Sequence, residues 1–123
     1  MRHVTTGFAA SPAAAAYARH VVAATAHDWG LDDMVDLLTL LVSELVTNPV
    51  THAGSGGTLV LSELERGVHV DVADSSPDLP TSPTLDLMAS SGRGLRLVDS
   101  VADRWGVDVR PVGKIVWFEL STA

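Results

Sequence analysis

The sequence predicts an α+β fold: a two-layer sandwich with helices packed on one face of a mainly antiparallel sheet. Two segments with helical spacing of apolar residues come first, and two pairs of strand-like segments joined by short turns follow them. Short turns join neighbouring antiparallel strands, and amphipathic helices bury their apolar stripe on such a sheet. The 123 residues fit one compact unit, so we expect a single domain over 1–123.

The first helix is predicted over 12–28. Ser11 followed by Pro12 is typical of an N-cap and a first helical position. The residues expected on the buried side of this helix are Tyr17, Val21, Val22 and Ala24 or Thr25. The segment before it, Met1–Ala10, is expected to be a loop, because polar residues interrupt any leader-like apolar run.

A second helix is predicted to begin at Asp32 and Asp33, whose carboxylates suit the positive end of a helix dipole. Its apolar stripe recurs with helical spacing and consists of Met34, Leu37, Leu38, Leu41, Leu45 and Val46. Pro49 lies further along the same segment. Because proline lacks the helical N–H and clashes with the preceding turn, we expect the helix to kink or end there.

Two hairpins are predicted in the second half of the chain. Segments 58–64 and 68–73 are separated by one glycine-containing turn, and segments 104–110 and 114–120 by another. The second segment alternates cleanly between apolar and polar residues, so one of its faces lies on a core. The tryptophans are expected to be core or helix-packing residues; they are Trp29, Trp105 and Trp117.

Composition excludes several classes of protein. Fifteen acidic and eight basic residues give a net charge of −7, and no basic run stands out, so neither a nucleic-acid partner nor an anionic membrane partner is expected. The absence of cysteine excludes disulfides and thiolate metal sites. The apolar stretches are too short for a membrane span. We therefore expect a cytoplasmic protein.

The first chemical motif lies on the second predicted helix. Glu44 and Asn48 are four residues apart and so point to the same side of it, with His52 one further turn along. A carboxylate in this setting can act as a general base, an amide oxygen can ligate Mg²⁺, and a histidine there can border bound phosphates. The alternative is a solvated stripe on a surface helix, which the spacing alone does not distinguish.

The second motif is Asp74, at the point where the alternating strand meets a turn. A buried acceptor there can take a hydrogen bond from an exocyclic amine such as the amino group of adenine. The alternative is an Asx-turn, in which the aspartate bonds to its own main chain before Ser76-Pro77.

The third motif closes the segment of about 75–92, which contains three prolines and is expected to be a functional lid or a disordered segment. Gly92-Arg93-Gly94-Leu95 ends it and leads into a short predicted helix over 95–98. Glycines let the main chain approach a phosphate, helix-start N–H groups attract an anion, and Arg93 adds a positive charge. A plain helix N-cap is the alternative, but the order of all three motifs favours an ATP-binding protein.

On these residues the chain resembles the GHKL, or Bergerat-fold, ATPase superfamily, and most closely the small anti-sigma-factor serine kinases of high-GC bacteria. The stretch from Glu44 to Asn48 with His52-Ala53 is similar to the N-box of that family, and Val72–Pro77 is similar to its G1 region. Gly92–Val98 resembles its G2 region, and Gly113–Trp117 its last strand. The resemblance runs from about Pro12 to Leu120.

The resemblance implies a role for each matched residue: Glu44 as catalytic base, Asn48 as Mg²⁺ ligand and Asp74 as the residue that recognises adenine. Gly92 and Gly94 would let the lid close on the phosphates of ATP. It also implies transfer of the γ-phosphate to a serine or threonine of an anti-anti-sigma partner, and sequestration of a sigma factor. A homodimer is a possible assembly, with the first ten residues available as an additional strand.

Three residue choices depart from the family pattern. Pro49 follows Asn48 where relatives commonly carry alanine, Ser76-Pro77 replaces the glycines of the wider superfamily, and Lys114 stands where sigma-regulating kinases tend to have threonine beside the adenine. Pro49 favours a second hypothesis, a non-catalytic or weakly catalytic interaction module in transcriptional regulation. A third hypothesis is an ATPase that transfers phosphate only to water.

Overall fold

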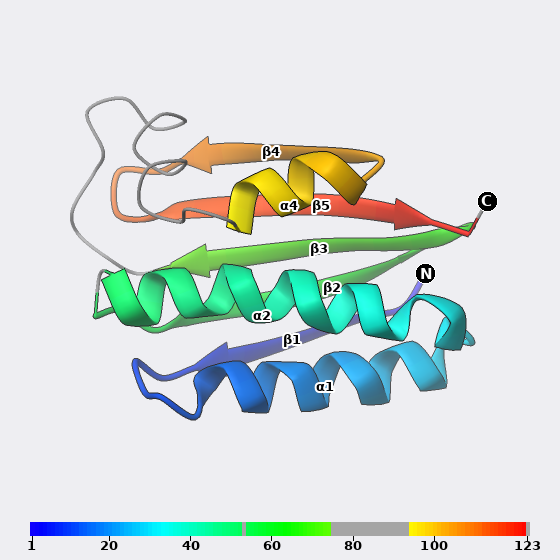
Figure 1. Cartoon of the computed structure of the whole chain (residues 1–123), viewed down its shortest axis with the longest axis horizontal. Helices are drawn as coiled ribbons and strands as arrows, with labels where there is room; N and C mark the ends of the chain where they lie inside the picture. The colour runs from blue at the N-terminus through cyan, green and yellow to red at the C-terminus, as the bar shows by residue number, and fades with distance from the viewer. Residues whose placement is uncertain (53, 75–93, 123) are drawn as a thin grey trace.

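The computed structural model describes residues 1–52, 54–74 and 94–122. Its elements in chain order are β1 (His3–Phe8), α1 (Ala14–Asp28), the short 3-10 helix η1 (Asp32–Met34), α2 (Val35–His52), β2 (Gly57–Leu64), β3 (Gly67–Asp74), α4 (Gly94–Val101), β4 (Arg104–Val109) and β5 (Lys114–Ser121). Figure 1 shows α1 and α2 lying side by side along the strands. None of the described helices is long and apolar enough to cross a membrane.

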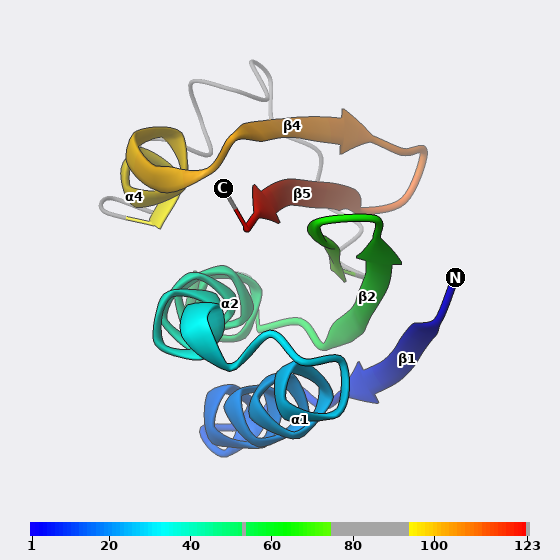
Figure 2. The same ribbon diagram turned by 90° about the vertical axis from the view of Figure 1, so that its right-hand side faces the viewer.

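The strands form one five-stranded sheet in the order β1-β2-β3-β5-β4, and each neighbouring pair is antiparallel. Figure 2 shows α1, α2 and α4 on the same side of this sheet, whose other face carries none of the described helices. The predicted α+β two-layer sandwich is therefore confirmed, as are both predicted hairpins. The arrangement is consistent with the Bergerat ATP-binding fold.

The expectation of a loop at the start of the chain is wrong. β1 pairs with β2 over its whole length, from His3 opposite Ser62 to Phe8 opposite Gly57. The strand turns Phe8 into the core, while the hydroxyl of Thr6 bonds the hydroxyl of Tyr17 at 2.7 Å. A polar inward residue hides the apolar alternation that would have marked a strand.

The first helix begins two residues later than predicted. Ser11 does not cap it: the hydroxyl accepts the N–H of Ala13 at 3.2 Å, and the N-cap position falls on Ala13 without a side-chain bond. The predicted buried side is only partly right, because Tyr17 is 47% exposed. The buried residues are small: Ala14, Ala18, Val22, Thr25 and Ala26.

The second helix supplies most of the core on the helical side. Its predicted stripe faces the sheet, with Leu38, Leu41, Leu45 and Val46 buried. Of the two outcomes expected at Pro49, a kink or an end, the helix does not end there, since α2 continues to His52. Proline removes the N–H that would bond to the carbonyl of Leu45, but only the last turn of the helix depends on that bond.

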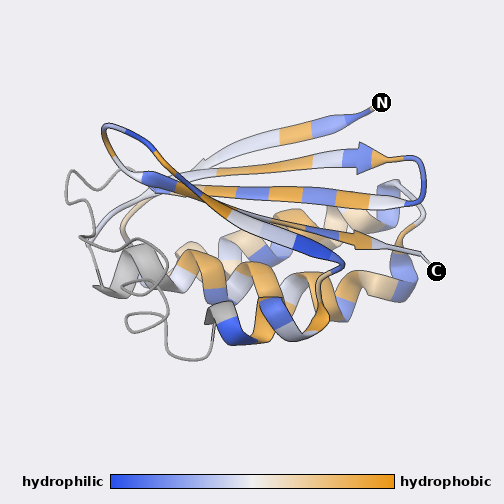
Figure 3. Ribbon diagram, turned by 90° about the horizontal axis from the view of Figure 1, so that it is seen from above, coloured by the Kyte–Doolittle hydropathy of each residue, from blue (hydrophilic) through white to orange (hydrophobic). Residues whose placement is uncertain are grey.

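The two faces of the sheet differ in polarity, and Figure 3 shows the helices under one face only. Val116, Phe118 and Leu120 of β5 point into the core. Trp117 therefore points to the open face, so its predicted core position is wrong. Trp29 is buried as predicted. Trp105 packs against the core and donates its indole N–H to Asp99 at 2.9 Å.

Candidate functional site

The described elements that carry or adjoin the chemical motifs meet at one end of the molecule. α2 and β3 both finish there, and α4 and β5 both start there, as Figure 1 shows at its left side. The antiparallel pairing of β3 with β5 fixes this arrangement, because it places the end of one strand beside the start of the other. Segments far apart in the sequence therefore meet at this end.

The α2 part of the site carries Glu44. Its side chain is half-buried, because the neighbouring Leu45 and Val46 are turned into the core. Ser43 beside it accepts a hydrogen bond from Arg19 of α1 at 2.9 Å, which ties the two helices together at this level. A carboxylate can act as a general base when it lies within hydrogen-bond reach of the proton it accepts, and this role of Glu44 stays a prediction.

The other two residues of this motif, Asn48 and His52, lie on the same helix as Glu44. Their main chain belongs to the last turns of α2, so the helical spacing that the sequence predicted is present. Their side chains lie outside the described part of the structure. The predicted Mg²⁺ ligation by Asn48 and phosphate contact by His52 stay predictions.

The β3 part of the site is Asp74, the last residue of the strand. Its side chain points to the helix-covered face, in the same alternation as Val68, Val70 and Val72. Only 9% of the residue is exposed. A buried carboxylate needs hydrogen-bond donors, so the local chemistry suits recognition of an amine.

Lys114, which the sequence marks only as a departure from the family pattern, is also a site residue. Its ammonium donates to Oδ2 of Asp74, and the side chain is only 16% exposed. The two residues are 40 positions apart, so the contact depends on the β3–β5 pairing. The available signal is strand alternation, which gives Lys114 the inward direction of Val116, Phe118 and Leu120.

Gly113 allows β5 to approach Asp74 closely. Its φ is +79°, a conformation that glycine adopts without strain. A Cβ at this position would collide with the main-chain oxygen of Asp74 and lie 3.1 Å from its Oδ1. The turn before it is closed by the N–H of Arg110, which bonds the carbonyl of Gly113 at 3.1 Å. The β4–β5 turn thus fixes the ammonium of Lys114 against the carboxylate.

The third motif is only partly visible. α4 begins at Gly94 and packs through Val98, which is fully buried. Its start lies toward the end of the sheet at which β3 finishes (Figure 1). Gly92, Arg93 and the predicted lid lie outside the described residues, as does the side chain of Leu95. The predicted phosphate contacts of this motif stay predictions.

Magnesium is the metal cofactor that the sequence predicts for this site. Within the described ranges, no three histidine or carboxylate side chains gather into a group that could hold a metal ion. Mg²⁺ commonly takes one or two protein oxygens and completes its shell with phosphate and water. An ion bound here would follow that pattern, with Asn48 as the proposed protein ligand.

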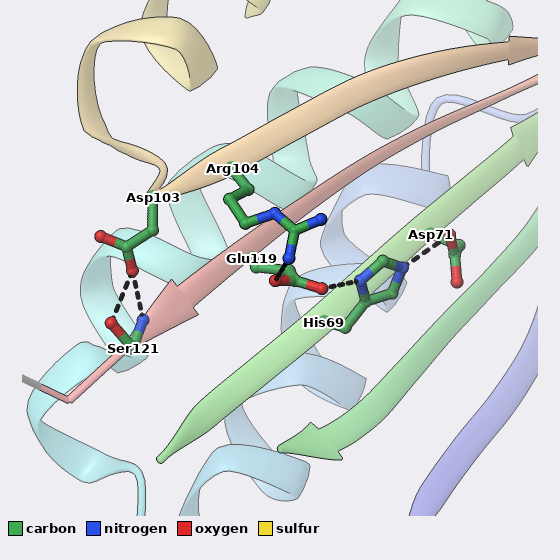
Figure 4. A network of polar contacts seen from close by, with 6 residues as sticks. All are labelled: His69, Asp71, Asp103, Arg104, Glu119 and Ser121. Atoms are coloured by element: carbon green, nitrogen blue, oxygen red, sulfur yellow. Dashed lines mark hydrogen bonds and ion pairs between the residues drawn. The ribbon is translucent and has the colours of Figure 1, made fainter. Parts of the chain in front are cut away.

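A second polar cluster occupies the open face of the sheet, and Figure 4 shows its members. His69 on β3 bonds Glu119 through Nδ1 at 2.8 Å and Asp71 through Nε2 at 3.0 Å. Its ring stacks on Trp117, with ring centroids 5.2 Å apart. The guanidinium carbon of Arg104 lies over the ring of the same tryptophan, 5.9 Å from its centroid, and Nη1 of Arg104 is 3.7 Å from Oε1 of Glu119.

The charge state of His69 follows from these contacts. Partial burial lowers its pKa, but the hydrogen bonds to Glu119 and Asp71 outweigh burial, so the pKa of His69 is raised above 6.5. The protonated ring donates from both nitrogens and satisfies both carboxylates. This cluster lies on the opposite face from Asp74, so it is a separate feature of the sheet.

Comparison with known proteins agrees with this geometry. A family model described as the histidine kinase-like ATPase domain matches residues 8–120. The match takes in every described helix, the strands β2, β3 and β4, and β5 up to Leu120. An uncharacterized protein of Streptomyces coelicolor is 39% identical over 75 residues, covering 56% of this chain and 70% of that protein.

Proposed function

The chain belongs to the histidine kinase-like ATPase domain family, which implies ATP binding, and from this premise we propose that it is a serine/threonine kinase of the anti-sigma type. Its substrate would be a hydroxyl on an anti-anti-sigma protein, and its second partner a sigma factor. The observation that supports the proposal best is the buried carboxylate of Asp74 at the end of β3, beside the end of α2.

The proposed reaction is an in-line displacement at the γ-phosphorus of ATP. The partner's hydroxyl oxygen forms the new P–O bond, the bond to the β-phosphate oxygen breaks, and ADP leaves. Glu44 takes the hydroxyl proton, for which its half-buried place on α2 is suitable. Magnesium would neutralise charge on the phosphates, with Asn48 as its proposed protein ligand.

A second candidate function is a non-catalytic interaction module. Pro49 supports it, because it removes one hydrogen bond in the last turn of α2, the turn that carries Asn48 and His52. Replacing Pro49 by alanine restores that bond. A rise in Mg²⁺-dependent ATP affinity or phosphate transfer in Pro49→Ala would indicate that the proline has weakened the site.

The test of the proposal has two stages. Calorimetric titration with ATP, with and without Mg²⁺, should show saturable binding that Mg²⁺ strengthens. Incubation with γ-labelled ATP and small anti-anti-sigma proteins should then label a partner serine or threonine.

The matched variants separate catalysis from binding. Glu44→Ala should lower phosphate transfer by about 10²-fold or more and leave ATP affinity largely unchanged. Asp36→Ala removes an exposed carboxylate near the other end of α2 and should change neither. Phosphate release to water without protein labelling would indicate an ATPase, and full transfer by Glu44→Ala would exclude Glu44 as the base.

A further inference from the structure

The sheet has two edge strands, and they differ in how they are protected. β1 lies at one edge and β4 at the other, as Figure 2 shows. β4 carries the exposed residues Arg104 and Asp108, and charged side chains on an edge strand discourage pairing with another chain. His3–Phe8 of β1 contains no proline, lysine, arginine or carboxylate. The edge of β1 therefore lacks the protection that β4 has.

The main chain of β1 alternates between groups that bond β2 and groups that point away from it. The N–H of Glu63 donates to the carbonyl of Arg2 at 2.8 Å, so these two residues form a hydrogen-bonded pair. Such pairs alternate with non-hydrogen-bonded pairs along an antiparallel ladder. The register of β1 with β2 therefore directs the main-chain N–H and C=O groups of His3, Thr5 and Gly7 outward. Among the described strands, none pairs with this edge.

The positive charge next to this edge is held on the helix-covered side of the sheet. Arg2 donates to the carboxylate of Glu63 from Nε at 3.2 Å and from Nη2 at 2.8 Å. Its guanidinium carbon lies 5.7 Å from the ring centroid of Trp29, a buried residue that follows α1. The charge of Arg2 is thus engaged within its own chain and leaves the outer edge of β1 without a charge of its own.

An exposed apolar stripe on α1 lies beside the same edge. The hydroxyl of Tyr17 bonds that of Thr6 at 2.7 Å, which places the tyrosine next to β1, and 47% of the residue is exposed. Ala13 and Ala24 are exposed as well, four residues before Tyr17 and seven after it, so helical spacing puts them on the same side of α1. The edge thus combines unpaired main-chain groups with apolar side chains.

We propose that β1 pairs antiparallel with β1 of a second copy of this chain, around a two-fold axis that passes beside Thr5. The two sheets then form one continuous sheet, and the two α1 helices run antiparallel on the same side of it. The apolar stripe of one α1 faces that of the other, which covers the exposed ring of Tyr17. This inference does not depend on the proposed kinase activity.

The register follows from the symmetry of such an interface, in which both copies use the same residues. Centred on Thr5, the pairing sets Thr5 opposite Thr5 of the second copy and His3 opposite Gly7, so all three outward-bonding residues have partners within the strand. A shift in either direction sets one of them opposite a residue outside His3–Phe8. Gly7 has no side chain, so it leaves room for the imidazole of His3 on the open face.

The pairing also places the two candidate sites far from each other. Phe8 lies opposite Gly57, and Gly57 lies opposite Asp74, so β1 finishes at the end of the sheet that carries the site. The two-fold axis reverses the strand direction of the second copy. The two sites therefore lie at opposite ends of the joined sheet, and each has its own access to a partner.

The first experiment measures the mass of the full chain in solution by sedimentation over a range of concentrations. Wild-type protein should form a dimer. Thr5→Pro removes an N–H that points away from β2, so it keeps the β1–β2 ladder and should raise the dimer dissociation constant by about 10-fold or more, since two main-chain bonds across the axis are lost. Thr5→Val keeps the N–H and should keep the dimer. Circular dichroism checks that both variants are folded.

The second experiment tests the register and does not require Thr5→Pro to fold. The chain has no cysteine, so Thr5→Cys supplies a single thiol. Residues in a hydrogen-bonded antiparallel pair have Cα atoms about 5.5 Å apart, a separation that a disulfide spans. On mild oxidation Thr5→Cys should form a covalent dimer at least about 10-fold faster than Asp108→Cys, whose exposed thiol on β4 meets another only by collision.

Three outcomes would overturn the proposal. A monomer at every concentration of wild-type protein would leave this edge open to a strand of a different protein. A dimer that Thr5→Pro leaves unchanged would mean that another surface joins the two copies. Equal rates of disulfide formation in Thr5→Cys and Asp108→Cys would mean that Thr5 does not face its counterpart.

Discussion

Strands β3 and β5 carry charged groups on both of their faces, and the two faces treat those charges differently. On the helix-covered face, Asp74 and Lys114 form one pair whose carboxylate is 4% exposed. On the open face, His69, Asp71 and Glu119 form a network whose side chains are 22–30% exposed. Water thus reaches every member of the second group and almost none of the carboxylate in the first.

This contrast separates a partly exposed cluster, which costs little free energy to form, from a buried pair whose desolvation is costly. Ion pairs near the surface contribute about 0–1 kcal/mol and are easily exchanged. Breaking a buried pair by removing one partner costs about 3–5 kcal/mol, because the remaining charge has lost its partner. The buried pair is therefore the better candidate for a functional role, although the open-face network contains more residues.

The largest effect is expected from a substitution that disrupts the close approach of Gly113 to the main chain of Asp74. Gly113→Ala should lower the free energy of unfolding by about 3 kcal/mol, since it combines a left-handed conformation with a collision against Asp74. Gly30→Ala is the matched control: its φ is +71°, but nothing lies within 4 Å of the added Cβ, so a loss of about 1 kcal/mol is expected. Urea unfolding of both variants measures the difference, and equal losses would contradict the collision.

A smaller effect is expected in double-mutant cycles, which compare the coupling free energies of the two clusters directly. The cycle of Asp74→Asn with Lys114→Met should give a coupling free energy of about 2 kcal/mol. The cycle of His69→Gln with Glu119→Gln, measured near pH 6 (approximately the ordinary histidine pKa), should give less than about 1 kcal/mol. Coupling of equal size in both cycles would remove the distinction between the buried and open faces.

The smallest effect is a pH dependence that belongs to the open face alone. Hydrogen bonds to Glu119 and Asp71 outweigh burial and raise the pKa of His69 above 6.5, so its protonated form is the one that the folded state prefers. This contribution to stability is fully present below 6.5 and is lost as the pH rises through the folded pKa. Urea unfolding between pH 5 and about 9 should show this fall in wild-type protein.

Two variants test whether His69 produces this fall in the free energy of unfolding with rising pH. His69→Gln should lack the fall in stability over this range, while His20→Gln, which removes an exposed histidine of α1, should keep it. An unchanged slope in His69→Gln would mean that other groups produce it.

Much of the fold follows from short-range patterns in the sequence. The helical stripe containing Leu38, Leu41 and Leu45 and the alternation around Val70 each lie within one element, so local spacing predicts them. Local spacing does not predict β1, because the polar residue Thr6 occupies one of its inward positions. Its hydroxyl bonds that of Tyr17, a residue of a different element. The large apolar ring of Trp117 suggests a core position, but strand alternation decides its side. Val116 and Phe118 point into the core, so Trp117 between them points to the open face.

For the described part of the candidate site, the sequence predicts individual residues such as Asp74 but not the contacts between them. Asp74 could be selected because it ends an alternating strand, and its burial agrees with that selection. The contact with Lys114 requires the order and register of β3 and β5, which no local pattern contains. Gly113 shows the same limit, because its need for a glycine arises from the main chain of a different hairpin.

The order of the strands also has a consequence for how the chain folds. Each hairpin, β2–β3 and β4–β5, closes a short loop, whereas joining β3 to β5 brings together residues as far apart as Gly67 and Ser121. Long-range pairing of this kind has an entropic cost of loop closure. This cost arises before the stabilising contacts form, so the pairing slows folding. We expect each hairpin to form before the two dock, so that Asp74 meets Lys114 only when β3 pairs with β5. The contact between these two side chains thus requires the complete sheet, which neither hairpin supplies by itself.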